Sequence, residues 1–106
     1  MPTNLFAQIP PHLPAELLEI LCQEEHLRIE RIVSRGHASP ADFWYDQEWH
    51  EFVVLLSGRA RVMFAADNRA VELAPGDWLE IKAHMRHRVD WTDPQQDTVW
   101  LAVHYQ

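Results

Sequence analysis

Residues 51–65 read EFVVLLSGRARVMFA, and this stretch decides the fold class. Its first part, Glu51–Leu56, is a short, strongly apolar run that stops at Ser57-Gly58, which is typical of a buried strand ended by a turn. A second run, Arg61–Ala65, follows and reaches its own turn at Asp67-Asn68. The stretch therefore predicts two consecutive β-strands.

The same pattern continues on both sides of this stretch. Upstream, an alternating pattern from His26 predicts a strand over Leu27–Val33. Downstream, turn residues such as Pro75-Gly76-Asp77 and Asp93-Pro94 separate four more short runs. Short strands at such regular spacing are typical of a β-sandwich or closed barrel. These further strands are expected at Ala70–Leu73, Trp78–Ile81, His87–Trp91 and Thr98–Tyr105.

The N-terminal quarter reads differently. Three prolines in Asn4–Pro14 exclude a continuous helix there and predict an extended arm along the surface. After Pro14, apolar residues at helical spacing predict one short helix through about Gln23, with Cys22 as a buried, inert thiol. We therefore expect a single domain over residues 1–106, with the arm and helix in 1–25 and a β-barrel in 26–106.

Composition narrows the classes of partner. The chain has 106 residues, 47% of them hydrophobic, which suits one folded domain. Its net charge of -7 and its single lysine, Lys82, argue against binding to nucleic acid or an anionic membrane. No apolar run reaches the roughly 20 residues that span a bilayer, and the N-terminus lacks a basic segment typical of export signals. A soluble, cytoplasmic protein is expected.

The strand Glu51–Leu56 also bears on assembly. Phe52, Val54 and Leu56 share one face and Val53 and Leu55 the other, so both faces need apolar cover. A homodimer that packs sheet against sheet would provide it, and the N-terminal helix and arm are the alternative.

Two clusters of residues carry a family resemblance. Glu51 precedes Gly58 by seven positions, and Gly76-Asp77 is followed by a strand, a turn and His87. These resemble the two motifs of the cupin superfamily, and the phrases around them are similar to those of small bacterial cupin-2 proteins. The resemblance covers residues 29–105 and implies a double-stranded β-helix, a jelly-roll barrel with a cavity at one mouth.

The resemblance breaks where the family carries its metal-binding histidines. Depending on the spacing, those positions fall on Tyr45 and Gln47 or on Trp44 and Asp46, and neither choice supplies a histidine. In the second motif Lys82, His84 and Trp91 replace the usual proline, glycine and asparagine.

The resemblance then implies a metal set of Gln47, Glu51 and His87. In a regular strand His50 points away from Glu51, so it could join the set only through a bulge near Trp49. His104 on the last strand is a further candidate. Such a nitrogen and oxygen set suits iron, manganese, nickel, zinc or copper, but a neutral amide is a weak donor, so weak binding is expected.

Two functions stay open at this point. In the first, a weakly bound metal supports oxygenase or isomerase chemistry on a small polar molecule. In the second, a metal-free barrel binds or senses a small ligand, or serves as a structural dimer. Without a metal, Glu51 and His87 could act as a general acid and base in a cavity walled by aromatic residues, or simply plug the barrel as a polar pair. The aromatic candidates for the wall are Tyr45, Trp78 and Trp100.

The arginines of the later strands are a second open point. They could hold an anionic ligand or form solvent-facing cross-strand pairs with nearby carboxylates. The residues concerned are Arg59, Arg61, Arg86 and Arg88.

Overall fold

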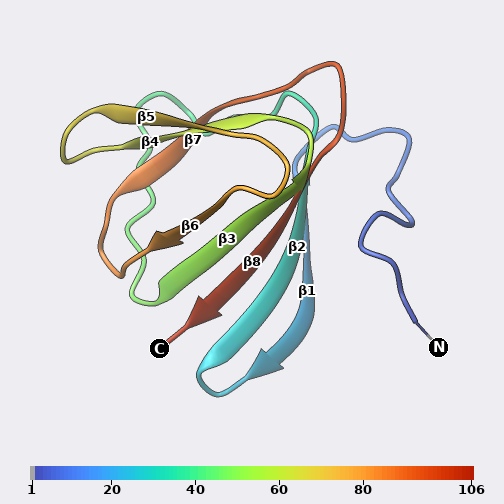
Figure 1. The fold of residues 1–106 in the computed structure, drawn as a ribbon, viewed down its shortest axis with the longest axis horizontal. Helices are drawn as coiled ribbons and strands as arrows, with labels where there is room; N and C mark the ends of the chain where they lie inside the picture. The colour runs from blue at the N-terminus through green and yellow to red at the C-terminus, as the bar shows by residue number, and fades with distance from the viewer. Residues whose placement is uncertain (1) are drawn as a thin grey trace.

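The computed structural model describes residues 2–106 and is all-β, as the sequence predicts (Figure 1). No helix long and apolar enough to cross a membrane occurs in that range. The eight strands are β1 (Leu17–Glu24), β2 (Leu27–Ser34), β3 (His50–Ser57), β4 (Ala60–Phe64), β5 (Arg69–Leu73), β6 (Trp78–Ile81), β7 (His87–Thr92) and β8 (Thr98–Tyr105).

The strands form two antiparallel sheets. One has the order β1-β2-β8-β3-β6 and the other the order β5-β4-β7. The chain crosses repeatedly between them, so strands distant in sequence become neighbours; β8, for example, lies between β2 and β3. Figure 1 shows the smaller sheet facing one end of the larger one. This is the jelly-roll arrangement of a double-stranded β-helix.

The core lies between the two sheets. Alternate residues of a strand point to opposite faces, and on β3 the inward positions Val53 and Leu55 are buried. They pack with Ala102 of β8 and, from the smaller sheet, with Val62 and Phe64 of β4. The space between the sheets is therefore filled mainly by apolar side chains.

The predicted N-terminal helix is wrong, because Leu17–Glu24 forms strand β1 instead. This strand pairs with β2 in a hairpin whose turn is Glu25-His26. A register shift between Ile20 and Cys22 inserts one extra residue, and such a bulge moves the apolar alternation out of phase. The shifted alternation imitates helical spacing, and the hydrogen bonds available along the edge of β2 outweigh the local preference. Cys22 is exposed on this edge strand, so the prediction of a buried thiol is also wrong.

The proline-rich arm lies along the surface, as predicted, and two arginines hold it. Buried Arg31 forms an ion pair with Glu19 and donates from Nη1 to the carbonyl oxygens of Leu5 and Ala7 at 3.0 and 2.6 Å. Arg35 donates to the carbonyl oxygen of Pro11 at 2.9 Å. Because prolines cannot donate backbone hydrogen bonds, an arm rich in them is fixed through its carbonyl groups.

Candidate functional site

A pocket of about 570 Å³ opens between the two sheets. Its wall comes from strands of both sheets, from the loop 37–47, and from Pro14–Glu16 at the end of the arm. The strand residues are mostly buried, whereas Glu16, Pro40 and Phe43 are exposed. The arm and the loop therefore form the rim of the pocket, and the polar strand residues lie deep inside it.

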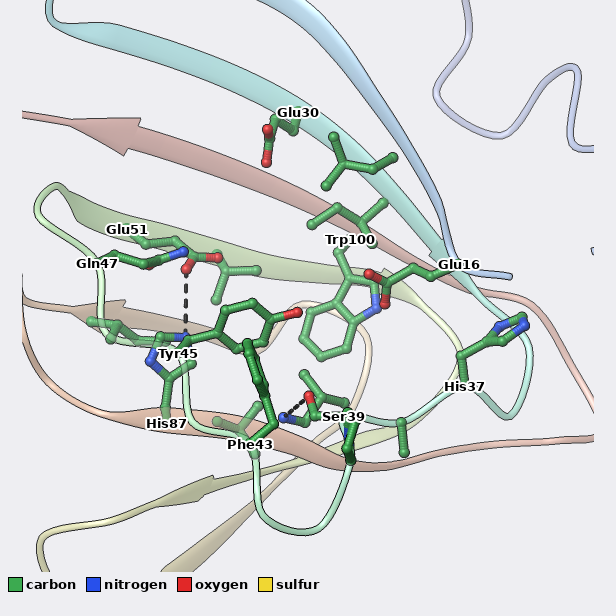
Figure 2. Close-up of a pocket in the computed structure, with 18 of the residues that line it drawn as sticks. Glu16, Glu30, His37, Ser39, Phe43, Tyr45, Gln47, Glu51, His87 and Trp100 are labelled. Carbon is green, nitrogen blue, oxygen red and sulfur yellow. Dashed lines mark hydrogen bonds and ion pairs between the residues drawn. The ribbon is translucent and has the colours of Figure 1, made fainter. Parts of the chain in front are cut away.

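Glu51 and His87 form the central pair of the pocket (Figure 2). Glu51 Oε1 and His87 Nε2 are 3.7 Å apart, and the residues are 8% and 5% exposed. That distance is too long for a direct hydrogen bond, so the two groups face each other across a narrow gap. On the other side of the ring, His87 Nδ1 lies 2.9 Å from the carbonyl oxygen of Met85. A carbonyl only accepts, so Nδ1 carries a proton and the neutral ring offers its Nε2 lone pair to Glu51.

Burial moves the pKa values of both groups towards their neutral forms. The pKa of Glu51 is raised to about 7, first by burial and then by the negative charge of Glu30. The pKa of His87 is lowered, mainly by burial, although its bond to the Met85 carbonyl opposes this change. At neutral pH the site therefore holds a carboxyl group able to give a proton beside an imidazole able to accept one.

A second buried cluster lies beside this pair. His104 Nε2 is 2.9 Å from Glu30 Oε1, and Arg28 Nε is 2.9 Å from the other oxygen of Glu30. His104 stands directly opposite Glu51 in the β3–β8 register. Glu30 thus has two partners of its own, while its negative charge raises the pKa of Glu51 from β2, on the other side of β8.

Tyr45 connects the loop 37–47 to the site. Its backbone N–H donates to the carbonyl oxygen of His87 at 2.7 Å, and its ring stacks on the His87 ring at 5.4 Å between centroids. Phe43 packs edge-on against Tyr45 at 4.8 Å. Burial raises the pKa of the Tyr45 hydroxyl, so this residue is a neutral wall. Its position fixes the orientation of the imidazole ring.

The structure brings some of the predicted site residues together. Gln47, Glu51 and His87 all line the pocket, and so does His104, which the sequence left open. His50 does not: its Nδ1 accepts a hydrogen bond from the N–H of Ala83 at 2.9 Å, and its ring lies 5.2 Å from that of Tyr105. The strand is regular at this point, so no bulge turns His50 inward.

The four arginines do not line the pocket. Arg61 forms the predicted cross-strand pair, with its Nε 3.0 Å from both carboxylate oxygens of Asp90. Arg88 donates to the carbonyl oxygen of Ser39 at 3.1 Å. The reading of these residues as ligands for an anion is not supported at this pocket.

Sequence reasoning missed Glu16, Glu30 and Ser39 as lining residues. Glu30 points into the barrel from β2. The alternating pattern puts it on the more polar side of that strand, which the sequence alone would turn towards solvent. Glu16 and Ser39 belong to the arm and the loop, whose places depend on long-range packing that no local pattern records.

The residues present do not fit a cupin-type metal centre. Among residues 2–106, no three or more histidine, cysteine, aspartate or glutamate side chains are grouped so that they could hold a metal ion. His104 also lines the pocket, but its Nε2 is engaged by Glu30 at 2.9 Å. The predicted donor set is therefore one imidazole, the carboxyl group that faces it, and the neutral amide of Gln47. Such a set lacks the several imidazoles that suit a transition metal.

Comparison with known proteins identifies the family. The family model described as "Cupin domain" matches residues 32–104. The barrel, its two sheets and its mouth with an inward glutamate and histidine agree with that match, and the chain belongs to the cupin family. No curated protein matches the chain.

Solved structures with the same fold include one at high identity. A putative mannose-6-phosphate isomerase from Ralstonia eutropha JMP134 is 46% identical, with 100% of this chain and 98% of that chain covered and a TM-score of 0.95. A cupin superfamily protein from Desulfitobacterium hafniense DCB-2 is 19% identical over 92% and 83%, with a TM-score of 0.75. The polyketide cyclase RemF from Streptomyces resistomycificus is also 19% identical, over 85% and 64%, with a TM-score of 0.72. The last two share the fold alone.

Proposed function

We propose that this cupin binds a small, uncharged, largely apolar molecule and moves a proton within it, without a metal. The observation that carries the proposal is the pair Glu51 and His87, buried 3.7 Å apart in an open pocket with pKa values shifted towards the neutral forms. Perturbed groups of complementary function in a cleft are typical of acid–base sites. The chemistry is that of an isomerase acting beside a carbonyl group.

Each group has a defined part in such a reaction. His87 Nε2 accepts a proton from the carbon next to the carbonyl, and the Glu51 carboxyl group donates its proton to the carbonyl oxygen. The C–H bond breaks, the O–H bond forms, and the product is the enol. In the return step His87 gives its proton back to that carbon, or to the far carbon of the double-bond system where the enol is conjugated. Glu51 takes back the proton of the enol O–H, so the ketone re-forms and both side chains regain their starting states. Positioned acid–base groups of this kind accelerate proton transfer by roughly 100-fold or more each.

The charge of the pocket limits the substrate class. Its lining includes Glu16, Glu30 and Glu51 but no lysine or arginine. Binding of a phosphate group normally relies on arginine, lysine or several backbone N–H donors. The name of the Ralstonia relative combines an isomerase with a phosphorylated sugar. Proton transfer agrees with the Glu51–His87 pair, whereas a phosphate does not suit this lining.

Deuterium exchange tests the proposal. The probe is 2-tetralone, an uncharged bicyclic ketone, incubated with the protein in D₂O while proton NMR follows the loss of its α-protons. We expect the wild type to accelerate exchange over buffer, and Glu51→Gln and His87→Asn each to remove about 100-fold or more of that acceleration. His84→Asn is the control, since His84 is an exposed turn residue with positive φ, which asparagine tolerates.

Two outcomes would count against the proposal. Tight binding of 2-tetralone without accelerated exchange would leave a binding or sensor module, which is the alternative function. Exchange that persists in both variants would show that groups other than Glu51 and His87 carry out the proton transfer.

We also infer that the chain forms a homodimer through the outer face of its larger sheet. Phe52 and Val54 of β3 point outward beside Val103 and Leu101 of β8, and all four are only half-buried. Trp78 stacks on Phe52 at 5.2 Å between ring centroids and is 60% exposed. A continuous apolar sheet face of this kind is a self-complementary surface around a two-fold axis.

A further inference from the structure

The indole N–H of Trp100 is a buried donor that lacks a partner. Trp100 is 4% exposed and lines the pocket, and its Nε1 has no hydrogen-bond acceptor within residues 2–106. A buried donor left unsatisfied costs about 1–3 kcal/mol, and folded proteins rarely retain one without a reason. The donor belongs to the wall of an open pocket, so a molecule bound there is the candidate source of the missing acceptor.

Trp100 lies apart from the Glu51–His87 pair. Figure 2 shows Tyr45 between that pair and Trp100, and it shows the indole nitrogen on the side of the ring that faces Glu16. Apolar side chains, among them Val53, Val62 and Val89, also line the pocket. The pocket therefore offers two separate polar positions in a lining that also carries apolar side chains.

The groups near Trp100 limit the kind of acceptor. Glu16 accepts a hydrogen bond from Ser34 Oγ at 3.0 Å, and burial raises the pKa of its carboxyl group. No lysine or arginine lines the pocket, and the nearby His37 already accepts a hydrogen bond at Nδ1 from the backbone N–H of Arg35 at 3.0 Å. A lone neutral N–H donor next to a carboxyl group suits an uncharged oxygen, such as an ether, ester or ketone.

We propose that Trp100 Nε1 binds an uncharged oxygen at one end of the ligand while the reacting carbonyl lies at the Glu51–His87 pair. This assignment rests on the proposed function and adds the substrate class. The substrate is an apolar cyclic molecule that carries two oxygen-containing groups at separate positions. Trp100 is then a specificity residue, and it takes no part in the proton transfer.

The test compares two probes that differ by one atom. The first is 6-methoxy-2-tetralone, whose ether oxygen lies at the opposite end from its ketone. The second is 6-ethyl-2-tetralone, in which a CH₂ group replaces that oxygen. Indole N–H signals of ¹⁵N-labelled wild-type protein are followed in both titrations, and the signal of Trp100 is assigned as the one missing from Trp100→Phe. The four other Trp→Phe variants assign it by elimination if Trp100→Phe does not fold.

We expect the Trp100 signal to move downfield with the methoxy probe and much less with the ethyl probe. Wild type should bind the methoxy probe about 3- to 10-fold more tightly than the ethyl probe, as one hydrogen bond predicts. Trp100→Phe should lose that difference. Trp78→Phe is the matched control, because Trp78 is on the outer face and should leave both affinities unchanged.

Equal responses of the Trp100 signal to the two probes would overturn the assignment, and so would equal loss of both affinities in Trp100→Phe. Absence of binding by both probes would overturn it as well. Failure of the proposed function looks different: α-proton exchange would be absent in the wild type, while the Trp100 signal would still distinguish the probes.

Discussion

Glu51 and His87 come from opposite sheets of the barrel, and their side chains face each other deep inside the pocket at 3.7 Å. Neither residue pairs with the other through backbone hydrogen bonds, so their distance depends on how the two sheets pack. The apolar core between the two sheets fixes that packing. The geometry of the acid–base pair is therefore a property of the whole barrel.

The first prediction concerns the pH dependence of stability. The pKa of Glu51 is about 7 in the folded protein against an ordinary value of 4.5, so folding favours the protonated form. The contribution of Glu51 to the free energy of unfolding is fully present below pH 4.5. It is lost as the pH rises towards and through 7. Glu51→Gln keeps a neutral group at all pH values. Between pH 4.5 and pH 8, the free energy of unfolding of Glu51→Gln should therefore rise relative to that of the wild type by on the order of 3 kcal/mol.

Urea unfolding at a series of pH values measures this difference. Glu16 also has a raised pKa and contributes to the slope of the wild type, but subtracting the two curves isolates Glu51. The exposed Glu48 supplies a control, as Glu48→Gln should run parallel to the wild type. Parallel curves for wild type and Glu51→Gln would show that the carboxyl is not protonated on folding.

The second prediction concerns metals. Because the predicted set offers one imidazole with a carboxyl group and an amide, and His104 is engaged by Glu30, the wild type should retain no stoichiometric iron, manganese, nickel, zinc or copper. Elemental analysis after purification without a tag or chelator measures retention, and thermal unfolding with each metal measures binding. Stoichiometric metal that disappears in both Glu51→Ala and His87→Ala would instead establish the weak site predicted from the sequence.

The third prediction concerns the dimer. A charge placed within the apolar outer face should be costly to bury, so Trp78→Glu should convert the dimer into a monomer of 12.5 kDa. Light scattering coupled to size-exclusion chromatography measures the mass. Trp91→Glu is the control, since Trp91 is a partly exposed tryptophan of the smaller sheet. A wild type that is monomeric at high concentration would refute the proposed interface.

Much of the barrel was predictable from local patterns. Trp78–Ile81 and Thr98–Tyr105 match β6 and β8 to the residue, and Glu51–Leu56 lies within β3. These runs are bounded by turn residues, which fix their ends. The strand β1 was not predictable because its bulge disguises the alternation, and only its pairing with β2 reveals it.

The candidate site was predictable in part for the same reason. Glu51 and His87 follow from motif positions, and the alternation of β3 correctly turns His50 away. The partners of Glu30 and the unpartnered indole of Trp100 depend on cross-strand register and on the loop 37–47. The contact between Glu30 and His104 joins residues 74 positions apart, and a linear pattern does not contain such a relationship.

The last prediction separates two glycines that the motifs treat alike. Gly58 and Gly76 both have positive φ, at 88° and 92°, where a side chain is strained. A Cβ at Gly58 would also lie 2.3 Å from Thr98 Oγ1 and 2.6 Å from Thr98 Cα, whereas a Cβ at Gly76 would meet nothing within 4 Å. Thr98 is fully buried at the start of β8, so its backbone cannot move aside without disturbing the strand that carries Trp100 and His104.

Gly76→Ala should therefore cost only the backbone strain, about 1–2 kcal/mol. Gly58→Ala should cost clearly more, because it adds the collision with a buried strand to a similar strain. Urea unfolding of the two variants beside the wild type measures both. Equal losses would mean that β8 yields freely at Thr98. In that case the start of β8 at Thr98 would not fix the distances between the residues that line the pocket.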